Sequence, residues 1–224
     1  MGDVEIRFEK VRSLDFADRV FCLTTDVGES LYSSVLIASG TKPIEYTTQG
    51  LQELKNKRLF YEVNAIVELT DRKIAVIGAG DAAFDYALNL SRKNNITIYN
   101  RSQRVSCLPV LRDRVRRNRS IMYKSDHILV SVEACQDTIM LYFDHKGFCY
   151  GEQFDYLLIS IGRRPNLDFV SPALCDKLTE LEVKHDLIRI GDVKNGSFRQ
   201  VGISVGDGIR AAMLLGKRIA TEGK

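Results

Sequence analysis

Residues 72–101, RKIAVIGAGDAAFDYALNLSRKNNITIYNR, place a glycine-rich turn between two apolar runs, and this pattern leaves few folds open to the chain. A β-branched run leads into Gly78, a helical pattern covers 81–92, and a second apolar run lies at 96–99. Strand, glycine-rich turn, helix and strand in this order are typical of the βαβ unit of Rossmann-like domains. The sequence predicts an α/β fold that binds a dinucleotide at this turn; the alternative is a βαβ unit that binds no nucleotide.

Each small residue of the turn has a physical reason. A Cβ at Gly78 would obstruct the turn, Gly80 lets backbone N–H groups approach a pyrophosphate, and Ala83 lets the helix lie close to the strand. Free N–H groups and the positive end of the helix dipole near Asp81 would then hold the anion.

Composition limits the class of protein. The 224 residues are 45% hydrophobic, which is enough for one large or two modest domains. No apolar run approaches the roughly 18 residues that span a bilayer, and the first ten residues hold no hydrophobic signal segment. We expect a soluble cytoplasmic protein with no membrane partner.

Five cysteines and three histidines show no metal-ligand spacing, and no Cys-x-x-Cys occurs. We expect reduced, buried thiols and neither a metal site nor a disulfide framework.

The net charge of +3 has a local source in residues 111–120, LRDRVRRNRS. Nucleic-acid binding is one interpretation of this run, but no aromatic residues alternate with its arginines. Val110, Leu111 and Val115 instead form an apolar stripe at helical spacing. We favour a solvated helix beside a phosphate-bearing ligand and expect no nucleic-acid partner.

Before the glycine turn, alternating runs at 4–11, 20–25 and 31–37 predict an antiparallel meander that ends in a buried strand. Residues 44–56 are polar and predict a domain crossing with one helical turn. After the turn, the patterns predict a helix at 108–118, a strand at 121–123, a second meander over 128–151 and an apolar strand at 154–162. Dense apolar runs separated by a helix indicate a parallel sheet.

The last third begins with a polar stretch that extends to residue 181. A buried strand at 187–192 follows, and then a helix over 204–220, with one face formed by Ile209, Ala212, Met213 and Ile219.

Four motifs in order resemble the low-molecular-weight thioredoxin-reductase branch of the FAD- and NAD(P)-dependent pyridine nucleotide oxidoreductases. LIASGTKP is similar to the family's Ala-Thr-Gly crossing, VIGAGDAAFDYAL to its NADPH fingerprint, ISIGRRPN to its return crossing and IGDVKNGSFRQVGISVGDG to its closing FAD motif. The resemblance covers nearly the whole chain. It implies a flavoprotein fold with two dinucleotide-binding domains, in which a Rossmann-like NADPH domain is inserted into the FAD domain.

The resemblance also implies roles for single residues. Asp192 matches the aspartate that bonds the ribityl–phosphate part of FAD, and the alternative is a plain turn aspartate after a strand. Residues 199–201 match the stretch along the flavin ring. The residues that we expect to contact NADP(H) or FAD are Gly78, Gly80, Asp81, Ala82, Ala83, Asn100, Arg101, Arg104, Gly162, Gly191, Asp192, Arg199, Gln200 and Val201.

The end of the second strand of the βαβ unit bears on the choice of nucleotide. NAD-specific folds place Asp or Glu there for the ribose 2′-OH, whereas a 2′-phosphate needs cations. The family's NADPH enzymes carry His-Arg-Arg; this chain has Asn100 and Arg101, with Arg104 as a substitute for the second arginine. NADPH is favoured over NADH, and the alternative is a pair of surface arginines.

Two departures from the family affect function. The positions of its redox Cys-x-x-Cys fall on Tyr61 and Asn64, so we expect no thioredoxin reduction by the family's route. The chain also starts inside the meander that follows the family's first Gly-x-Gly-x-x-Gly unit. We therefore expect a partial FAD domain (1–43 and 161–224) around a complete NADPH domain (44–160). A homo-oligomer or a second chain would cover the gap.

Two functions remain open on the sequence. One is a flavin-dependent oxidoreductase that passes hydride from NADPH through FAD to a non-dithiol acceptor. The other is a non-enzymatic NADPH-binding sensor, or a subunit that complements a separate FAD-binding chain. The sequence leaves open whether FAD binds and whether the protein is an enzyme.

Overall fold

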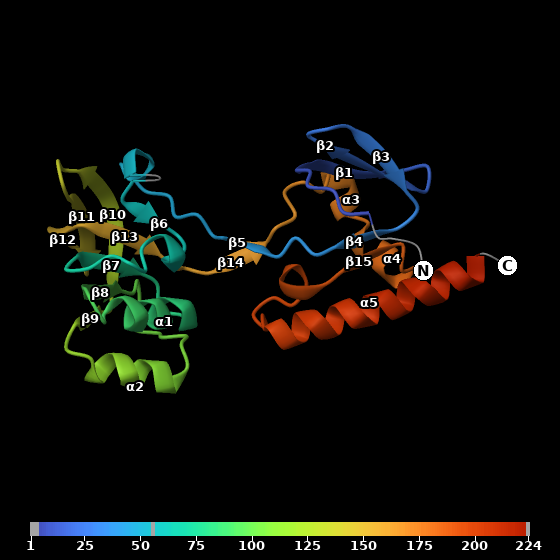
Figure 1. Cartoon of the computed structure of the whole chain (residues 1–224). Helices are drawn as coiled ribbons and strands as arrows, with labels where there is room; N and C mark the ends of the chain where they lie inside the picture. The colour runs from blue at the N-terminus through green and yellow to red at the C-terminus, as the bar shows by residue number, and fades with distance from the viewer. Residues whose placement is uncertain (1–4, 55–56, 223–224) are drawn as a thin grey trace. The chain divides into compact units, whose positions relative to one another are not determined.

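The computed structural model describes residues 5–54 and 57–222, with side chains described as far as Arg218. The chain divides into two compact units (Figure 1): unit 1 is Met1–Lys42 with Arg164–Lys224, and unit 2 is Pro43–Arg163. Unit 2 is therefore an insertion within unit 1. The boundaries predicted after residues 43 and 160 differ from these by one and three residues.

A five-stranded parallel sheet forms the centre of unit 2, with the strand order β6-β13-β7-β8-β9. This sheet confirms the predicted α/β class. Only β6 was not expected from the sequence. The strands are Leu59–Phe60 (β6), Lys73–Ile77 (β7), Asn95–Tyr99 (β8), Ile121–Lys124 (β9) and Tyr156–Ile159 (β13).

Both faces of this sheet are buried. Alternate residues of each strand point to opposite sides, so each strand contributes side chains to two apolar clusters. On β7, Ile74 and Val76 pack in a cluster with helix α1 (Asp81–Leu90), whereas Ala75 and Ile77 belong to the cluster on the other side. Figure 1 shows α1 on one side of the sheet and, on the other, the meander of strands β10, β11 and β12 within residues 127–154. Burial on both faces explains why these runs are continuously apolar.

The other elements of unit 2 follow the predicted order. Helix α2 packs its Val115 against the α1 side of the sheet, but Val110 is 52% exposed and does not belong to the predicted apolar stripe. These elements are the 3₁₀ turns Leu51–Leu54 (η1) and Val63–Ala65 (η2), helix Pro109–Arg117 (α2), and strands His127–Ala134 (β10), Ile139–His145 (β11) and Phe148–Phe154 (β12).

Unit 1 begins with an antiparallel meander of Val11–Ala17 (β1), Val20–Thr25 (β2) and Glu29–Tyr32 (β3). The predicted strand at 4–11 is wrong, since the strand starts only at its last residue. Ile6 and Phe8 are 74% and 98% exposed and have no core to pack on, whereas Leu14 of β1 is fully buried. Val4 lies outside the described residues.

The predicted run at 31–37 is two strands rather than one, because the chain bends at Ser33. Strand β4 (Val35–Ile37) leaves the meander and pairs in parallel with β15 (Leu187–Arg189) in a separate two-stranded sheet. Ile37 and Leu187 join the unit 1 core, but Leu36 stays 38% exposed.

The predicted polar stretch before residue 181 holds two short helices, Pro172–Cys175 (α3) and Leu178–Val183 (α4). Leu174, Leu178 and Leu181 recur at helical spacing and are all buried in the unit 1 core. This spacing was the missed signal.

The last helix, α5 (Val201–Glu222), exists as predicted but presents a different side to the protein. Ile209 and Met213 are 60% and 62% exposed, and Ala212 is exposed, whereas Ala211 is buried. The side chain of Ile219 lies outside the described residues. The apolar side of α5 is therefore open, and the packed side runs through Ala211.

The chain passes between the units twice, and the two passages pair as Thr41–Pro43 (β5) and Arg163–Pro165 (β14). Among the described residues, no helix has the length and apolar character that a membrane span requires. All five cysteines are free, but Cys135, Cys149 and Cys175 are exposed, which corrects the expectation of buried thiols.

Candidate functional site

The glycine turn lies at the carboxyl end of β7, between the two neighbouring strands. Gly78 has φ +137°, and a Cβ there would lie 2.1 Å from the backbone oxygen of Ser160, which follows β13. The Gly78 N–H donates to the carbonyl of Tyr99 at the end of β8 (3.0 Å). Ala83 is fully buried between α1 and the sheet. The turn is thus fixed by close backbone contact on both sides, which only glycine permits.

The first turn of α1 is open toward an anion. Gly80 is the N-cap residue, and no side chain of the described residues caps the helix. A Cβ at Gly80 would meet only the Ser106 hydroxyl, at 3.6 Å, and Asp81 and Ala82 are exposed. Uncapped N–H groups at a helix N-terminus attract phosphate, so this backbone fits the pyrophosphate of a dinucleotide.

The Asp81 carboxylate has a different partner from the one expected. Its Oδ1 accepts a hydrogen bond from the N–H of Leu108 (2.6 Å), the residue that precedes α2. The Ser106 N–H donates to the carbonyl of Ala79 (3.0 Å). Segment 101–108 is therefore tied back onto the glycine turn, and Asp81 organises this segment.

Asn100, expected beside the ribose, is buried and holds the turn that follows β8. Its Nδ2 donates to the carbonyl of Arg104 and to the Tyr123 hydroxyl, both at 2.9 Å, and its Oδ1 accepts from the N–H of Ser102 (3.3 Å). Arg101 and Arg104 are exposed on this turn. The structure thus places two cations on a turn that Asn100 fixes at the carboxyl edge of the sheet.

A partly buried ion cluster lies next to this edge. Tyr99 donates to Glu152 (2.6 Å), and Lys124 donates to the same carboxylate oxygen (2.6 Å). Burial raises the pKa of Tyr99, and its bond to Glu152 raises it further. Burial also acts to raise the pKa of Glu152, but its bonds to Lys124 and Tyr99 outweigh that effect, and the pKa is lowered.

Unit 1 holds a cavity of about 540 Å³ beside the N-terminus of α5. Five of the residues predicted to contact FAD line it, and Ala38 and Gly40, in the segment after β4, form another wall. The lining residues are Ala38, Gly40, Ile190, Gly191, Asp192, Arg199, Gln200, Val201, Ser204 and Val205. Gly162 does not line this cavity; it lies in unit 2, where its carbonyl accepts from the N–H of Ile44 (3.0 Å).

The cavity wall at Gly191 is held by two side chains that sequence reasoning missed. Asp207 of α5 accepts from the N–H of Gly191 (3.0 Å) and from Nδ2 of Asn195 (2.6 Å), and Asn195 also donates to the Gly191 carbonyl (2.9 Å). These hydrogen bonds lower the pKa of Asp207. The only sequence signal was Asp207 itself, one turn into a predicted helix.

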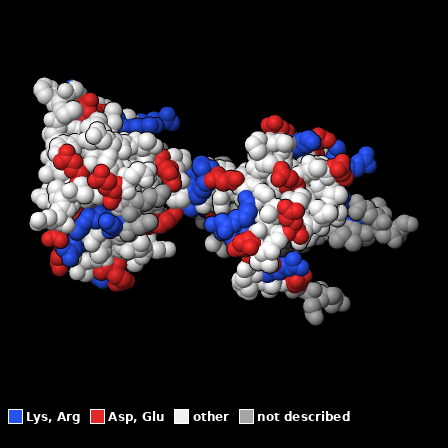
Figure 2. Space-filling model, turned by 90° about the horizontal axis from the view of Figure 1, so that it is seen from above, with Lys and Arg blue, Asp and Glu red and all other residues white. Residues whose placement is uncertain are grey.

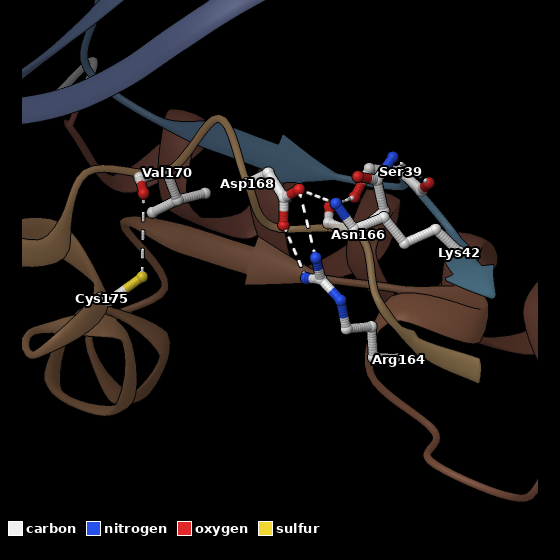
Figure 3. A network of polar contacts seen from close by, with 7 residues as sticks. All are labelled: Ser39, Lys42, Arg164, Asn166, Asp168, Val170 and Cys175. Carbon is white, nitrogen blue, oxygen red and sulfur yellow. Dashed lines mark hydrogen bonds and ion pairs between the residues drawn. The ribbon is translucent and has the colours of Figure 1, made fainter. Parts of the chain in front are cut away.

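The cavity wall at Ala38 and Gly40 is held by the polar network of Figure 3. Ser39 Oγ donates to the Asn166 carbonyl (2.6 Å). The Asn166 N–H donates to the Gly40 carbonyl (3.0 Å). Asp168 pairs with both Lys42 and Arg164 (2.6 Å for Arg164). The segment after the return crossing thereby holds the segment that carries Ala38 and Gly40.

The positions of the family's redox dithiol carry no sulfur. The Tyr61 hydroxyl accepts from the N–H of Tyr46 (3.2 Å), and Asn64 is an exposed residue of η2. All five cysteines are described, and none is disulfide-bonded.

Comparison with known proteins agrees with this geometry. Residues 4–183 match the family described as Pyridine nucleotide-disulphide oxidoreductase. The chain is 27% identical over 219 residues to the thioredoxin reductase of Treponema pallidum, covering 93% of this chain and 71% of that protein. It is 32% identical over 100 residues to a ferredoxin--NADP reductase of Wolbachia pipientis, covering 42% of this chain but only 30% of that protein.

Solved structures show the same fold at lower identity. Lactococcus lactis thioredoxin reductase in its FR conformation aligns with a TM-score of 0.81 at 20% identity, over 95% of this chain and 75% of that one. The bacillithiol disulfide reductase Bdr of Staphylococcus aureus aligns with a TM-score of 0.67 at 17% identity, over 94% and 71%. These findings confirm the resemblance read from the four motifs. The chain belongs to the pyridine nucleotide-disulphide oxidoreductases, a family of FAD- and NAD(P)-binding oxidoreductases, and has the thioredoxin-reductase fold.

Proposed function

We propose that this protein is an NADPH-dependent flavin oxidoreductase whose electron acceptor is not a dithiol protein. The observation that carries the proposal is the cavity in unit 1, because five residues expected along the flavin line it while the dithiol positions carry Tyr61 and Asn64. The relatives named thioredoxin reductase and ferredoxin--NADP reductase support this reaction class.

Unit 2 would bind the nucleotide through two adjacent features. The uncapped N-terminus of α1 behind Gly78 and Gly80 would hold the pyrophosphate, since its N–H groups and helix dipole favour an anion. Arg101 and Arg104 would hold the 2′-phosphate with charge-assisted hydrogen bonds. Asn100 acts by positioning the turn that carries both arginines.

Unit 1 would bind FAD in the cavity. Asp192 and the Gly191 backbone would hold the ribityl–phosphate part, and residues 199–201 would lie along the ring. The Asp207–Asn195 hydrogen bonds keep the Gly191 turn in place. When bound, FAD would supply two-electron chemistry between NADPH and the acceptor.

We also propose that another polypeptide, a second copy or a separate chain, covers the open apolar surface of unit 1. Val205, Ile209 and Met213 on α5 are 56–62% exposed, and Leu36 on β4 is 38% exposed. Exposed apolar surface of this kind is typical of an interface. Sedimentation of the purified chain as a monomer whose amides in residues 33–40 and 187–191 are protected from hydrogen exchange, with and without FAD, would contradict this proposal.

The nucleotide assignment is tested by titrating the chain with NADPH and NADH and following coenzyme fluorescence, which is simplified because the chain has no tryptophan. The double variant Arg101→Gln/Arg104→Gln should bind NADPH at least about 100-fold more weakly, since each of the two lost charge-assisted bonds is worth on the order of 1.5–3 kcal/mol. Its affinity for NADH should stay within about twofold.

The matched control is Arg72→Gln/Arg92→Gln, which removes the same charge from exposed positions at the opposite edge of the βαβ unit. This control should leave NADPH affinity unchanged. Equal affinity of the wild-type chain for NADPH and NADH would contradict the 2′-phosphate assignment.

The flavin assignment needs a separate measurement. Added FAD should acquire a protein-bound absorption spectrum and stimulate NADPH oxidation, and Arg199→Ala/Gln200→Ala should weaken both effects. A chain that binds NADPH but neither binds FAD nor turns over would instead be the non-enzymatic sensor.

A further inference from the structure

We propose that the exposed side of α2 is a docking surface for an acidic protein, that is, a folded partner that presents several carboxylates. We call it the arginine surface. It consists of Arg112, Arg114, Arg116, Arg117 and Arg119, all of which are exposed.

The net charge of residues 101–119 differs strongly from that of the rest of the chain. Residues 101–119 hold seven arginines and one acid, Asp113, so they carry +6, and the rest of the chain carries −3. In the described ranges, no carboxylate forms an ion pair with the arginine surface. On the face seen in Figure 2, by contrast, acidic and basic side chains are interspersed.

The helix itself accounts for only part of this charge. Cations in the last turn stabilise a helix through its dipole, which suits Arg114, Arg116 and Arg117. Arg112 lies before that turn and four residues from Arg116, a spacing at which like charges are destabilising. Arg119 lies beyond the helix. The chain therefore carries more positive charge here than the stability of α2 requires.

The arginine surface is held rigidly on unit 2. Val115 is buried against the α1 side of the sheet, the N–H of Leu108 is bonded to Asp81, and Asn118 Nδ2 donates to Ser91 Oγ (2.8 Å). The packed side of α2 is thus already used and cannot insert into a bilayer, which argues against a membrane partner.

The surroundings favour a protein over a nucleic acid. Leu108 and Val110, at the start of α2, are 55% and 52% exposed. They offer apolar contact area that a folded protein can cover and a phosphate backbone cannot. No aromatic residue for base stacking occurs in residues 101–119. Arginine forks match carboxylates in geometry, so the partner that fits is a carboxylate-rich protein surface with an apolar contact.

The test measures binding of fluorescein-labelled poly-L-glutamate to the full chain by fluorescence anisotropy, without nucleotide or flavin. We expect saturable binding that weakens about tenfold or more between low and high salt. The variant Arg112→Gln/Arg116→Gln/Arg117→Gln should weaken binding at least about tenfold. The variant with lysine at the same three positions keeps the positive charge and should therefore keep most of the affinity for poly-L-glutamate.

The control Lys10→Gln/Arg12→Gln/Lys177→Gln removes the same charge from exposed positions of unit 1. The affinity of this control for poly-L-glutamate should stay within about twofold of the wild-type value. Equal losses in both triple variants would overturn the proposal, as would the absence of binding. Tighter binding of duplex DNA or phosphatidylserine vesicles through the same three arginines would also overturn it. None of these outcomes depends on NADPH or FAD binding.

Discussion

Unit 2 and unit 1 use parallel sheets in opposite ways. In unit 2, every residue of β7 after Lys73 is buried, because α1 covers one face of the sheet and β10–β12 cover the other. Among the described residues of unit 1, the parallel sheet has only β4 and β15, and the side chains of Leu36 and Ile209 remain exposed. Residues of unit 2 itself cover both apolar faces of its sheet. In unit 1, some apolar side chains remain exposed because no described residue covers them.

The largest effect should come from Gly78→Ala. The new Cβ would lie 2.1 Å from the Ser160 carbonyl oxygen at φ +137°, so unit 2 should lose about 3–5 kcal/mol of unfolding free energy together with nucleotide affinity. Urea unfolding followed by circular dichroism, with NADPH titration, measures both.

Gly147→Ala is the control for this change, since Gly147 also has positive φ (+88°) but would meet nothing within 4 Å. It should cost only about 1 kcal/mol. Similar costs for the two variants would mean that φ alone, rather than the contact with β13, decides the turn.

The second prediction compares the buried core of unit 2 with the open apolar side of α5 in unit 1. Phe143→Ala removes a buried ring that stacks on Tyr99 at 3.9 Å and should cost about 3–5 kcal/mol. Ile209→Ala trims an exposed side chain of α5 and should change stability by less than about 0.5 kcal/mol. A concentration-dependent loss above about 1.5 kcal/mol for Ile209→Ala would sharpen the comparison, because it would mean that a second copy covers α5.

The smallest effects concern pH, and the two units should respond in different ranges. Burial lowers the pKa of His127 in unit 2. The fold therefore favours its neutral form, and unit 2 should lose stability as the pH falls below about 6.5. In unit 1, hydrogen bonds from Asn195 and Gly191 lower the pKa of Asp207. That stabilisation is present above about pH 4 and is lost below it as the carboxylate is protonated.

Amide hydrogen exchange of β10 and of β15 as a function of pH separates the two responses. His127→Gln should remove the pH dependence of protection in β10 and leave that of β15 unchanged. Asp207→Asn should remove the pH dependence in β15 and leave that of β10 unchanged. Simultaneous loss of protection in both segments would show that the units unfold together.

Local pattern predicted most of unit 2. The runs of β7, β8 and β13 are apolar on both faces, and the small residues of the glycine turn are demanded by contacts within a few residues of sequence or one strand away. The four family motifs likewise pointed to the residues around the unit 1 cavity.

The sequence could not predict contacts between residues that lie far apart in the chain. Asp207 bonds Gly191, sixteen positions before it, and no periodicity encodes that contact. The position of Asn100 suggested a ribose contact, but its side-chain amide forms hydrogen bonds with the backbone of Ser102 and Arg104 in the turn that follows β8. The stripe on α5 predicted a buried face, yet hydrophobic spacing identifies a face without showing what covers it.

The insertion of unit 2 has a consequence for the order of folding during synthesis. Unit 2 is one uninterrupted stretch, so all of its strands are translated before β15. Strand β4, in contrast, must wait for Leu187 to arrive before Val35 has a partner. Closing so long a loop is entropically costly unless the intervening chain is already compact. The nucleotide-binding half would therefore act as the folded spacer that brings the two ends of the other half together.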